Sequence, residues 1–403
     1  MPLHTLRKSK NFTNMITASR KLVAFLSASC LALTLTFTSI TGAQAATKIG
    51  ATCKQPNATS TVNGVAVKCL KTGNKYTWKK VAASSTSAAL PTSFSDLVAN
   101  RKGISQAAWT KVNQSIAKNT SKIGTFDIHT GPNTKPHFND YQKPVSLVSR
   151  LFPNMKEPAA NIVIRYMFKD VAWADTKVKE LIPSAEIERL NRSENGILLI
   201  SNCDSSRKTC DGSKQLTTSN GINLVLQGVP EKVYPNDLAG QDRFKGGMLE
   251  AHEYFHSLQR IPFQGIAVQQ KDYPPVWFFE GSAEWVQNVT INNRDFKKYK
   301  NYFDLDCQNT CRELTRSDII KILTEATNSF WPNKYDYWLN YALGSLLVES
   351  LVSITNPESI LIIFDEMAKR IGFAAAFKNV YGIEWSAAIP ILSEAVYLNL
   401  QGK

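Results

Sequence analysis

The stretch Gly247-Met-Leu-Glu-Ala-His252-Glu253-Tyr-Phe-His256-Ser-Leu-Gln-Arg260 has the spacing of apolar residues that is typical of a helix. Residues four apart lie on one face of a helix, so the imidazoles of His252 and His256 are expected to face a single metal ion. Glu253 lies about 100° around the helix from His252, within reach of a metal-bound water as a general base. The chain has five histidines, and two of them stand in this motif. The motif therefore predicts a metal site on a helix.

A second motif, Tyr273-Pro-Pro-Val-Trp-Phe-Phe-Glu280-Gly-Ser-Ala-Glu-Trp-Val, follows this helix. Together the two motifs resemble those of the gluzincin metallopeptidases, in which a Trp/Leu-rich Glu-Gly-x-Ala-Glu helix comes after His-Glu-x-x-His. The resemblance implies that His252, His256 and Glu280 bind Zn²⁺ and that Glu253 is the general base. It is strong only over residues 248–286.

Glu284 stands one helical turn after Glu280. The resemblance implies that it is the acidic partner that orients a ligand histidine. The alternative is that both glutamates are polar residues on a surface helix without a part in the chemistry.

The segment Tyr341-Ala-Leu-Gly344 resembles the Tyr-x-x-Gly helix of aminopeptidase-N-like gluzincins, in which the tyrosine hydroxyl stabilises the oxyanion. Tyr341 matches that tyrosine, and Tyr337 stands one turn earlier as the second choice. The alternative is structural, because aromatic residues on a helix commonly belong to the core.

One departure from that family concerns the substrate. Aminopeptidase-N-like enzymes have a Gly-x-Met-Glu-Asn strand whose glutamate binds the free amino group of the substrate. The corresponding strand here, residues 221–225, has no glutamate. The resemblance therefore implies an endopeptidase rather than an aminopeptidase, with this strand at a sheet edge pairing to an extended protein or peptide substrate. His129, His137 and the cysteine-containing loops offer no competing site.

The order of elements predicts an α+β fold, since strands come first and helices follow. Strands are expected at 161–168, 196–200 and 221–227, and helices at 93–119 and almost throughout from about residue 237. Thr355-x-x-Glu358 has the form of a capping box that opens a helix over 359–371. The resemblance implies a zincin-type domain over residues 93–403, in which a mixed sheet and the active-site helix precede a helical C-terminal part.

Residues 1–45 have the pattern of a cleavable bacterial Sec-type signal peptide. A basic segment precedes the apolar run 22–37, and Ala43-Gln-Ala45 has the small residues of a cleavage site. An uncleaved signal anchor is the alternative, and a lipoprotein signal through Cys30 fits less well. The expected location is outside the cell or at its envelope, with no stable membrane span after cleavage. No second long apolar run follows, which excludes a multi-span membrane protein.

Six cysteines remain after the signal, and an even count in an exported chain suggests disulfides. Pairing of sequence neighbours is the simplest of the 15 connectivities that six cysteines allow. A zinc site is the alternative, but the chain has no Cys-x-x-Cys. The predicted pairs are Cys53–Cys69, Cys203–Cys210 and Cys307–Cys311.

The net charge of +14 is concentrated at the N-terminal end of the chain. Residues 1–45 contribute +5 and residues 46–82 contribute +7 without a single acid, which leaves +2 for the remainder. A nucleic-acid-binding function for the large domain thereby loses its main support. Residues 46–82 have short strand-like pieces and are predicted to form a small β-hairpin module, stapled by a disulfide. They resemble Lys-rich modules of secreted bacterial proteins. Their lysines either hold an anionic envelope polymer or face water as a spacer.

Residues 83–92 are small and polar, as in a flexible linker between the module and the domain at 93–403. Hydrophobic residues make up 43% and charged residues 20% of the chain, which excludes a mostly disordered or fibrous protein. The sequence thus predicts a secreted zinc-dependent peptidase. The alternative is a catalytically inactive zincin-like protein that binds the envelope, although Glu253 and all three predicted ligands are present.

Overall fold

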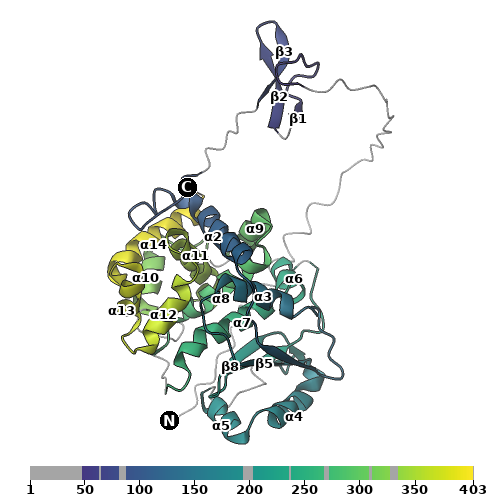
Figure 1. The fold of residues 1–403 in the computed structure, drawn as a ribbon, viewed down its shortest axis with the longest axis vertical. Helices are drawn as coiled ribbons and strands as arrows, with labels where there is room; N and C mark the ends of the chain where they lie inside the picture. The colour runs from purple at the N-terminus through teal and green to yellow at the C-terminus, as the bar shows by residue number, and fades with distance from the viewer. Residues whose placement is uncertain are drawn as a thin grey trace. The chain divides into compact units, whose positions relative to one another are not determined.

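The computed structural model describes residues 48–62, 65–80, 88–193, 203–235, 237–266, 272–307, 311–326 and 335–402. The predicted signal peptide, the first half of the predicted linker and the predicted strand 196–200 lie outside these residues. The chain divides between Ser84 and Ser85 into an N-terminal unit and a large unit, and each is described by itself below. The mixed α+β class predicted from the sequence is confirmed (Figure 1).

The N-terminal unit is an antiparallel sheet of three strands, β1 (Thr59–Val62), β2 (Val65–Thr72) and β3 (Lys75–Lys80). The turn between β2 and β3 contains Gly73 at a φ of 61°, a left-handed conformation that glycine adopts without strain. Three short strands bury little apolar surface, so the Cys53–Cys69 disulfide across 16 residues supplies the missing constraint.

The sheet of the large unit has the order β4-β5-β9-β8. Strands β4 (Thr125–Thr130), β5 (Ala160–Tyr166) and β9 (Ile222–Gly228) are parallel, and β8 (Ser213–Thr217) is antiparallel to β9. The predicted strands at 161–168 and 221–227 are confirmed as β5 and β9. The prediction that residues 221–225 form an edge strand was wrong, because β9 pairs with β5 on one side and with β8 on the other.

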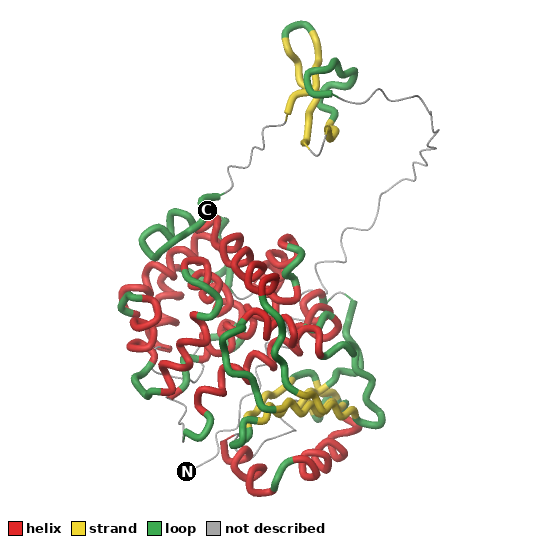
Figure 2. The backbone as a smooth tube through the Cα atoms, in the orientation of Figure 1, coloured by secondary structure: helices red, strands yellow, loops and turns green. Residues whose placement is uncertain are grey.

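The two faces of the sheet pack against different helices, as Figure 2 shows for the layer of strands between red segments. Side chains that alternate along β5 and β9 therefore belong to two different core clusters, one on each face of the sheet. Ile164 and Leu224 join a core cluster with α4 (Val171–Leu181) and α5 (Ser184–Ser193). Val163 and Val225 belong to the main core on the other face, which includes Tyr254 and Phe255 of the helix with the histidine motif.

The large unit continues almost entirely as helices after β9, as predicted. Helix α2 (Ile104–Lys118) covers only part of the helix predicted at 93–119, because residues 93–100 form turns. The remaining helices are α3 (Gln142–Leu151), α6 (Leu238–Lys245), α7 (Met248–Arg260), α8 (Val276–Ile291), α9 (Phe296–Cys307), α10 (Arg316–Ala326), α11 (Leu339–Ile354), α12 (Ser359–Ala368), α13 (Phe373–Tyr381) and α14 (Trp385–Leu400). Short 3₁₀ helices span Arg101–Gly103, Phe168–Asp170 and Ile261–Phe263.

Helices α8 and α11 cross where two glycines touch. A Cβ atom on Gly281 would lie 2.4 Å from the backbone carbon of Gly344, and one on Gly344 would lie 2.3 Å from the carbonyl oxygen of Trp277. No side chain fits in this contact, so only glycine at both positions permits it. The crossing joins the Glu-Gly motif of α8 to the Tyr-x-x-Gly motif of α11.

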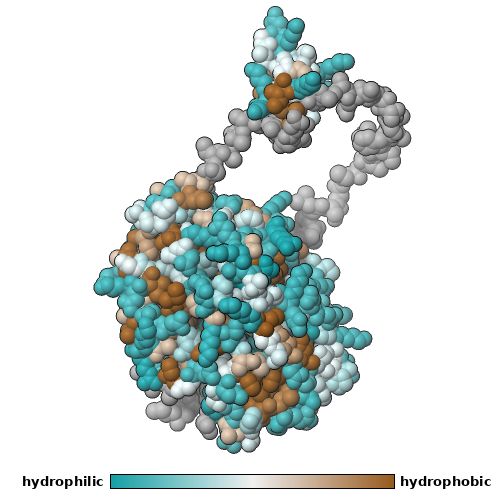
Figure 3. Space-filling model, in the orientation of Figure 1, coloured by the Kyte–Doolittle hydropathy of each residue, from teal (hydrophilic) through white to brown (hydrophobic). Residues whose placement is uncertain are grey.

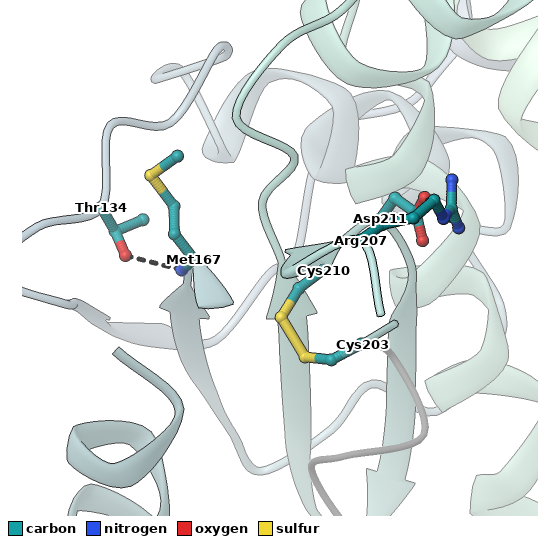
Figure 4. Close-up of a disulfide and its surroundings, with 6 residues drawn as sticks. All are labelled: Thr134, Met167, Cys203, Arg207, Cys210 and Asp211. Carbon is teal, nitrogen blue, oxygen red and sulfur yellow. Dashed lines mark hydrogen bonds and ion pairs between the residues drawn. A yellow bond between two sulfur atoms is a disulfide. The ribbon is translucent and has the colours of Figure 1, made fainter. Parts of the chain in front are cut away.

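The three disulfides are those predicted from the sequence, with Cys203–Cys210 and Cys307–Cys311 in the large unit. Figure 4 shows the second of them, which joins the directly opposed residues of β6 (Cys203–Asp204) and β7 (Thr209–Cys210). Pairing of near neighbours is therefore confirmed for the six cysteines that the structure describes.

Among the helices of the described residues, none is by itself long and apolar enough to cross a membrane. Helices α11 and α12 reach that length only as a pair bent by 104°, and most of their residues are buried in the main core. On the face drawn in Figure 3, apolar residues of the large unit form separate patches among hydrophilic ones.

Candidate metal centre

Helix α7 is buried along nearly its whole length, between the sheet and α8. It begins after Gly247, whose φ of 88° puts the chain against Phe138, where a Cβ would lie 2.9 Å from that ring. On its sheet side, Glu250 accepts a hydrogen bond from Gln227 of β9 at 2.9 Å, and Gln227 accepts one from Arg165 of β5 at 3.1 Å. These polar contacts fix the rotation of α7 and thereby direct its histidine face toward α8.

Three possible ligand atoms meet on that face. The Nε2 atoms of His252 and His256 are 3.0 Å apart, and Oε2 of Glu280 on α8 is 3.5 Å from the first and 3.3 Å from the second. All three side chains are largely buried. Among the described residues, this is the one cluster of three His, Cys, Asp or Glu side chains with metal-binding spacing.

The donor set fits zinc. Two imidazole nitrogens and one carboxylate oxygen are ordinary Zn²⁺ ligands, and three protein ligands leave one position of a tetrahedral site for water or substrate. Ligand atoms about 2.0–2.1 Å from a tetrahedral zinc are about 3.3 Å from one another. The three distances in the structure scatter around that value.

His256 is oriented by a residue that the sequence analysis missed. Its Nδ1 is 2.6 Å from Oε1 of Gln259, while the amide nitrogen of Gln259 donates to the Phe279 carbonyl at 2.9 Å and to Ser282 Oγ at 2.8 Å. Because the amide nitrogen already donates to α8, its oxygen faces His256 and accepts the Nδ1 proton. The lone pair of His256 then lies on Nε2, toward the other ligands. The one sequence signal is an amide residue three positions after the second histidine, on the same helix face.

Glu284 lies near Nδ1 of His252, on the other side of the ring from Glu280, but its hydrogen bonds go to residues of other helices. Its Oε2 is 3.7 Å from His252 Nδ1, which is beyond hydrogen-bond length, and that Nδ1 has no hydrogen-bond partner. The fully buried carboxylate instead accepts two hydrogen bonds of 3.0 Å from Arg243 of α6 and one of 2.7 Å from Tyr302 of α9. The expected orienting bond is therefore absent, and Glu284 anchors α6 and α9 beside the site.

The electrostatics of the ligand cluster favour a carboxylate beside two imidazoles. Burial raises the pKa of Glu280, but the two histidines outweigh it and hold that pKa well below its usual range. Burial lowers the pKa of His256, while the Glu280 carboxylate raises it, and the net shift is upward. The cluster thus attracts positive charge, whether from protons or from a metal ion.

Glu253 lies buried on α7 beside the ligands. Burial raises its pKa, and the charges of His252, His256 and Arg260 act in the opposite direction. A carboxylate that is poorly hydrated and next to a metal site is suited to accept a proton from water.

Tyr341 lies against the ligand His252, and Tyr337, whose side chain is half exposed, packs on Tyr341. The ring of Tyr341 stacks on His252 with centroids 6.0 Å apart, and the ring of Tyr337 meets that of Tyr341 edge-on with centroids 5.8 Å apart. Burial and the Glu280 carboxylate raise the pKa of Tyr337 to about 12 and that of Tyr341 higher still. Both hydroxyls therefore keep their protons near neutral pH and can donate hydrogen bonds.

The other histidines that the structure describes are engaged elsewhere. His129 contacts Asp127 at 2.9 Å, and His137 Nε2 is 2.7 Å from the Pro230 carbonyl.

Comparison of the chain with protein-family models, with curated proteins and with solved structures finds no match. The geometry of the site therefore carries the functional argument by itself.

Proposed function

We propose that this protein is a zinc-dependent peptidase of gluzincin type that hydrolyses peptide bonds in an extracellular or envelope location. The observation that carries the proposal is the convergence of His252, His256 and Glu280 on one point, with their ligand atoms 3.0–3.5 Å apart. Glu253, the general-base candidate, follows the first of these ligands directly. A structural role for the two motifs accounts poorly for two imidazole nitrogens facing each other in a buried cluster.

The roles of the residues follow from their positions. Zinc bound by the three ligands would acidify water and polarise the substrate carbonyl. Glu253 would accept the proton of the attacking water and later deliver it to the leaving amine. Tyr341, with Tyr337 beside it, would donate a hydrogen bond to the oxygen that becomes negative in the transition state.

Internal cleavage of a polypeptide is favoured over removal of an N-terminal residue. Among the described strands, β8 ends the sheet order and lies against α7, so an extended substrate could add beside it as a further strand. Neither β8 nor β9 has a glutamate to hold a free amino group. The substrate class is accordingly a protein or peptide bound in extended form.

Two substitutions in α7 test the proposal. His252→Ala removes a ligand, so elemental analysis of the purified variant should find the zinc lost from about one per chain. Glu253→Gln removes a proton acceptor but no ligand, so this variant should keep its zinc and lose turnover of a peptide library by at least about 100-fold.

The contrast between the variants distinguishes the alternatives. Full retention of zinc by His252→Ala would contradict the ligand assignment, and normal cleavage by Glu253→Gln would contradict the mechanism. A wild-type protein that binds zinc but cleaves no peptide would instead be the inactive, envelope-binding zincin-like protein.

The N-terminal unit suits attachment to an anionic polymer of the cell envelope. Residues 46–82 of this unit contain seven lysines and no acidic residue, and Lys68 lies directly opposite Lys79 in the β2–β3 register. Lys75 shares their face of the sheet, because side chains alternate along a strand. Like charges directly opposite each other destabilise a sheet, which is a cost that an anionic ligand would relieve.

A sedimentation assay tests this attachment. The double variant Lys68→Gln/Lys79→Gln should sediment less with envelope preparations at low salt, and the wild type should be released as salt rises, because exposed charges are screened within about 8–10 Å. The control variant Lys232→Gln/Lys297→Gln changes the net charge equally within the large unit. Equal sedimentation of the two double variants would favour a spacer.

A further inference from the structure

Arg260, the last residue of α7, lies one helical turn beyond the ligand His256. Its guanidinium carbon is 5.4 Å from the ring centre of Phe279 and 5.8 Å from that of Tyr273. Phe279 in turn stacks on the imidazole of His256, with ring centroids 4.7 Å apart and an interplanar angle of 14°. A chain of packed groups thus joins this cation to the metal ligands.

The guanidinium of Arg260 has no carboxylate or carbonyl partner among the residues that the structure describes. Its Nε is fully covered and makes no hydrogen bond, although the side chain as a whole is only half-buried. Two other arginines of the large unit, Arg165 and Arg243, do have hydrogen-bond acceptors. Arg165 donates to Gln227, and Arg243 donates to both oxygens of Glu284.

A covered Nε–H without an acceptor is costly, because the aromatic faces beside the guanidinium do not replace the hydrogen bond that water would accept. A guanidinium packed on aromatic rings keeps its N–H donors in its own plane, where they match the two oxygens of a carboxylate.

We propose that Arg260 is a substrate-binding residue that accepts a carboxylate of the peptide next to the cleaved bond. The inference rests on the proposed peptidase function and adds a substrate class to it, namely peptides that bring a negative charge to one subsite. That carboxylate belongs either to an acidic side chain or to the C-terminus of a short peptide. Arg260 touches neither zinc nor its ligands, so it sets preference rather than chemistry.

Matched peptides measure this preference. In one set, each position from the third residue before the cleaved bond to the third after it is Glu, Gln or Lys in turn. In a second set, short peptides end in a free carboxylate or in an amide. The measured quantity is the ratio of kcat/KM values within each pair. This ratio isolates the charge, because Glu and Gln have the same shape.

The wild type should favour the carboxylate in one pair by about tenfold to hundredfold, as expected for a hydrogen-bonded charge pair in a partly buried site. Arg260→Gln should bring that ratio close to one, and Arg260→Glu should favour Lys at the same position. The control Arg294→Gln, at an exposed arginine of the large unit, should keep the wild-type ratio.

The outcomes separate the two proposals. Cleavage of all pairs at equal rates, or a preference for acid that survives in Arg260→Gln, overturns the carboxylate subsite and leaves the peptidase intact. Preference in the side-chain set alone identifies an acidic residue, and preference in the second set alone identifies the C-terminus. A wild type that cleaves none of the peptides overturns the peptidase function together with the subsite.

Discussion

Glu280 and Glu284 are one turn apart on α8, and they meet different atoms of the same imidazole. Glu280 lies 3.5 Å from Nε2 of His252, whereas Glu284 lies 3.7 Å from Nδ1 and is bound to Arg243. Glu280→Ala should therefore largely empty the metal site. Glu284→Ala removes a neighbour of His252 and no ligand, so it should weaken zinc binding far less and leave activity that added zinc restores.

A zinc titration of both variants measures this difference. Glu284→Ala also leaves Arg243 without its buried partner, so its unfolding temperature should fall more than that of Glu280→Ala. The opposite order of zinc affinities would make Glu284 the third ligand.

At the scale of single residues, the sequence could predict those parts of the site that depend on local spacing. His252, Glu253 and His256 share a helix, and Glu280 stands in a motif with a defined place after them. Gln259 could not be recognised as a partner of His256, because its amide orientation is fixed by the Phe279 carbonyl of another helix. Likewise, the spacing of Glu284 gave no sign that Arg243 would occupy its carboxylate.

At the scale of elements, the closest approach of α8 and α11 depends on Gly281 and Gly344. Gly344→Ala would gain about 1 kcal/mol in helix propensity. Its Cβ, however, would lie 2.3 Å from the backbone oxygen of Trp277, so α11 would have to move. Overpacking of this kind costs about 1–3 kcal/mol or more and should dominate.

We expect Gly344→Ala to lower the unfolding temperature and to reduce peptide turnover more than zinc content, since Tyr341 moves with α11 while the ligands stay on α7 and α8. Ser345→Ala is the control, because its hydroxyl only donates to Ala342 within the same helix at 2.8 Å. Stability equal to that of the control would show that the two helices can separate without cost.

The sequence pattern within a segment predicted whether it forms a helix or a strand better than it predicted which other segments that element pairs with. The helix predicted from residue 359 begins at Ser359, but the capping-box prediction was wrong, since the Thr355 hydroxyl donates to the Leu351 carbonyl at 2.7 Å instead of accepting the Glu358 N–H. β9 was predicted as a strand yet misplaced as an edge, because strand order depends on pairing with distant segments. Strands β4 and β8 are short and mostly polar, and the sequence analysis missed them.

At the scale of the whole molecule, Glu349 makes stability depend on pH. This carboxyl of α11 is buried and accepts a hydrogen bond from Tyr299 at 2.6 Å, and burial raises its pKa to about 7. The unfolded chain releases this proton near pH 4.5. Between that pH and about 7 the folded state binds more protons, so this group's contribution to stability falls as pH rises, by on the order of 3 kcal/mol.

Glu349→Gln removes the titration but keeps the shape and an acceptor for Tyr299. The unfolding temperature of the variant minus that of the wild type should become more positive between pH 5 and pH 8. A difference that stays constant over this range would mean that Glu349 does not hold its proton in the fold.

The three disulfides each join cysteines that are close in the chain, with separations of 16, 7 and 4 residues. Closing a short loop is fast and loses little entropy, so every cysteine encounters its proper partner before a distant one. Oxidation can then follow the order in which the chain emerges, from the first pair to the last. Under oxidising conditions, the correct bonds are the kinetically preferred ones, and no cysteine has to wait for a partner in the other unit.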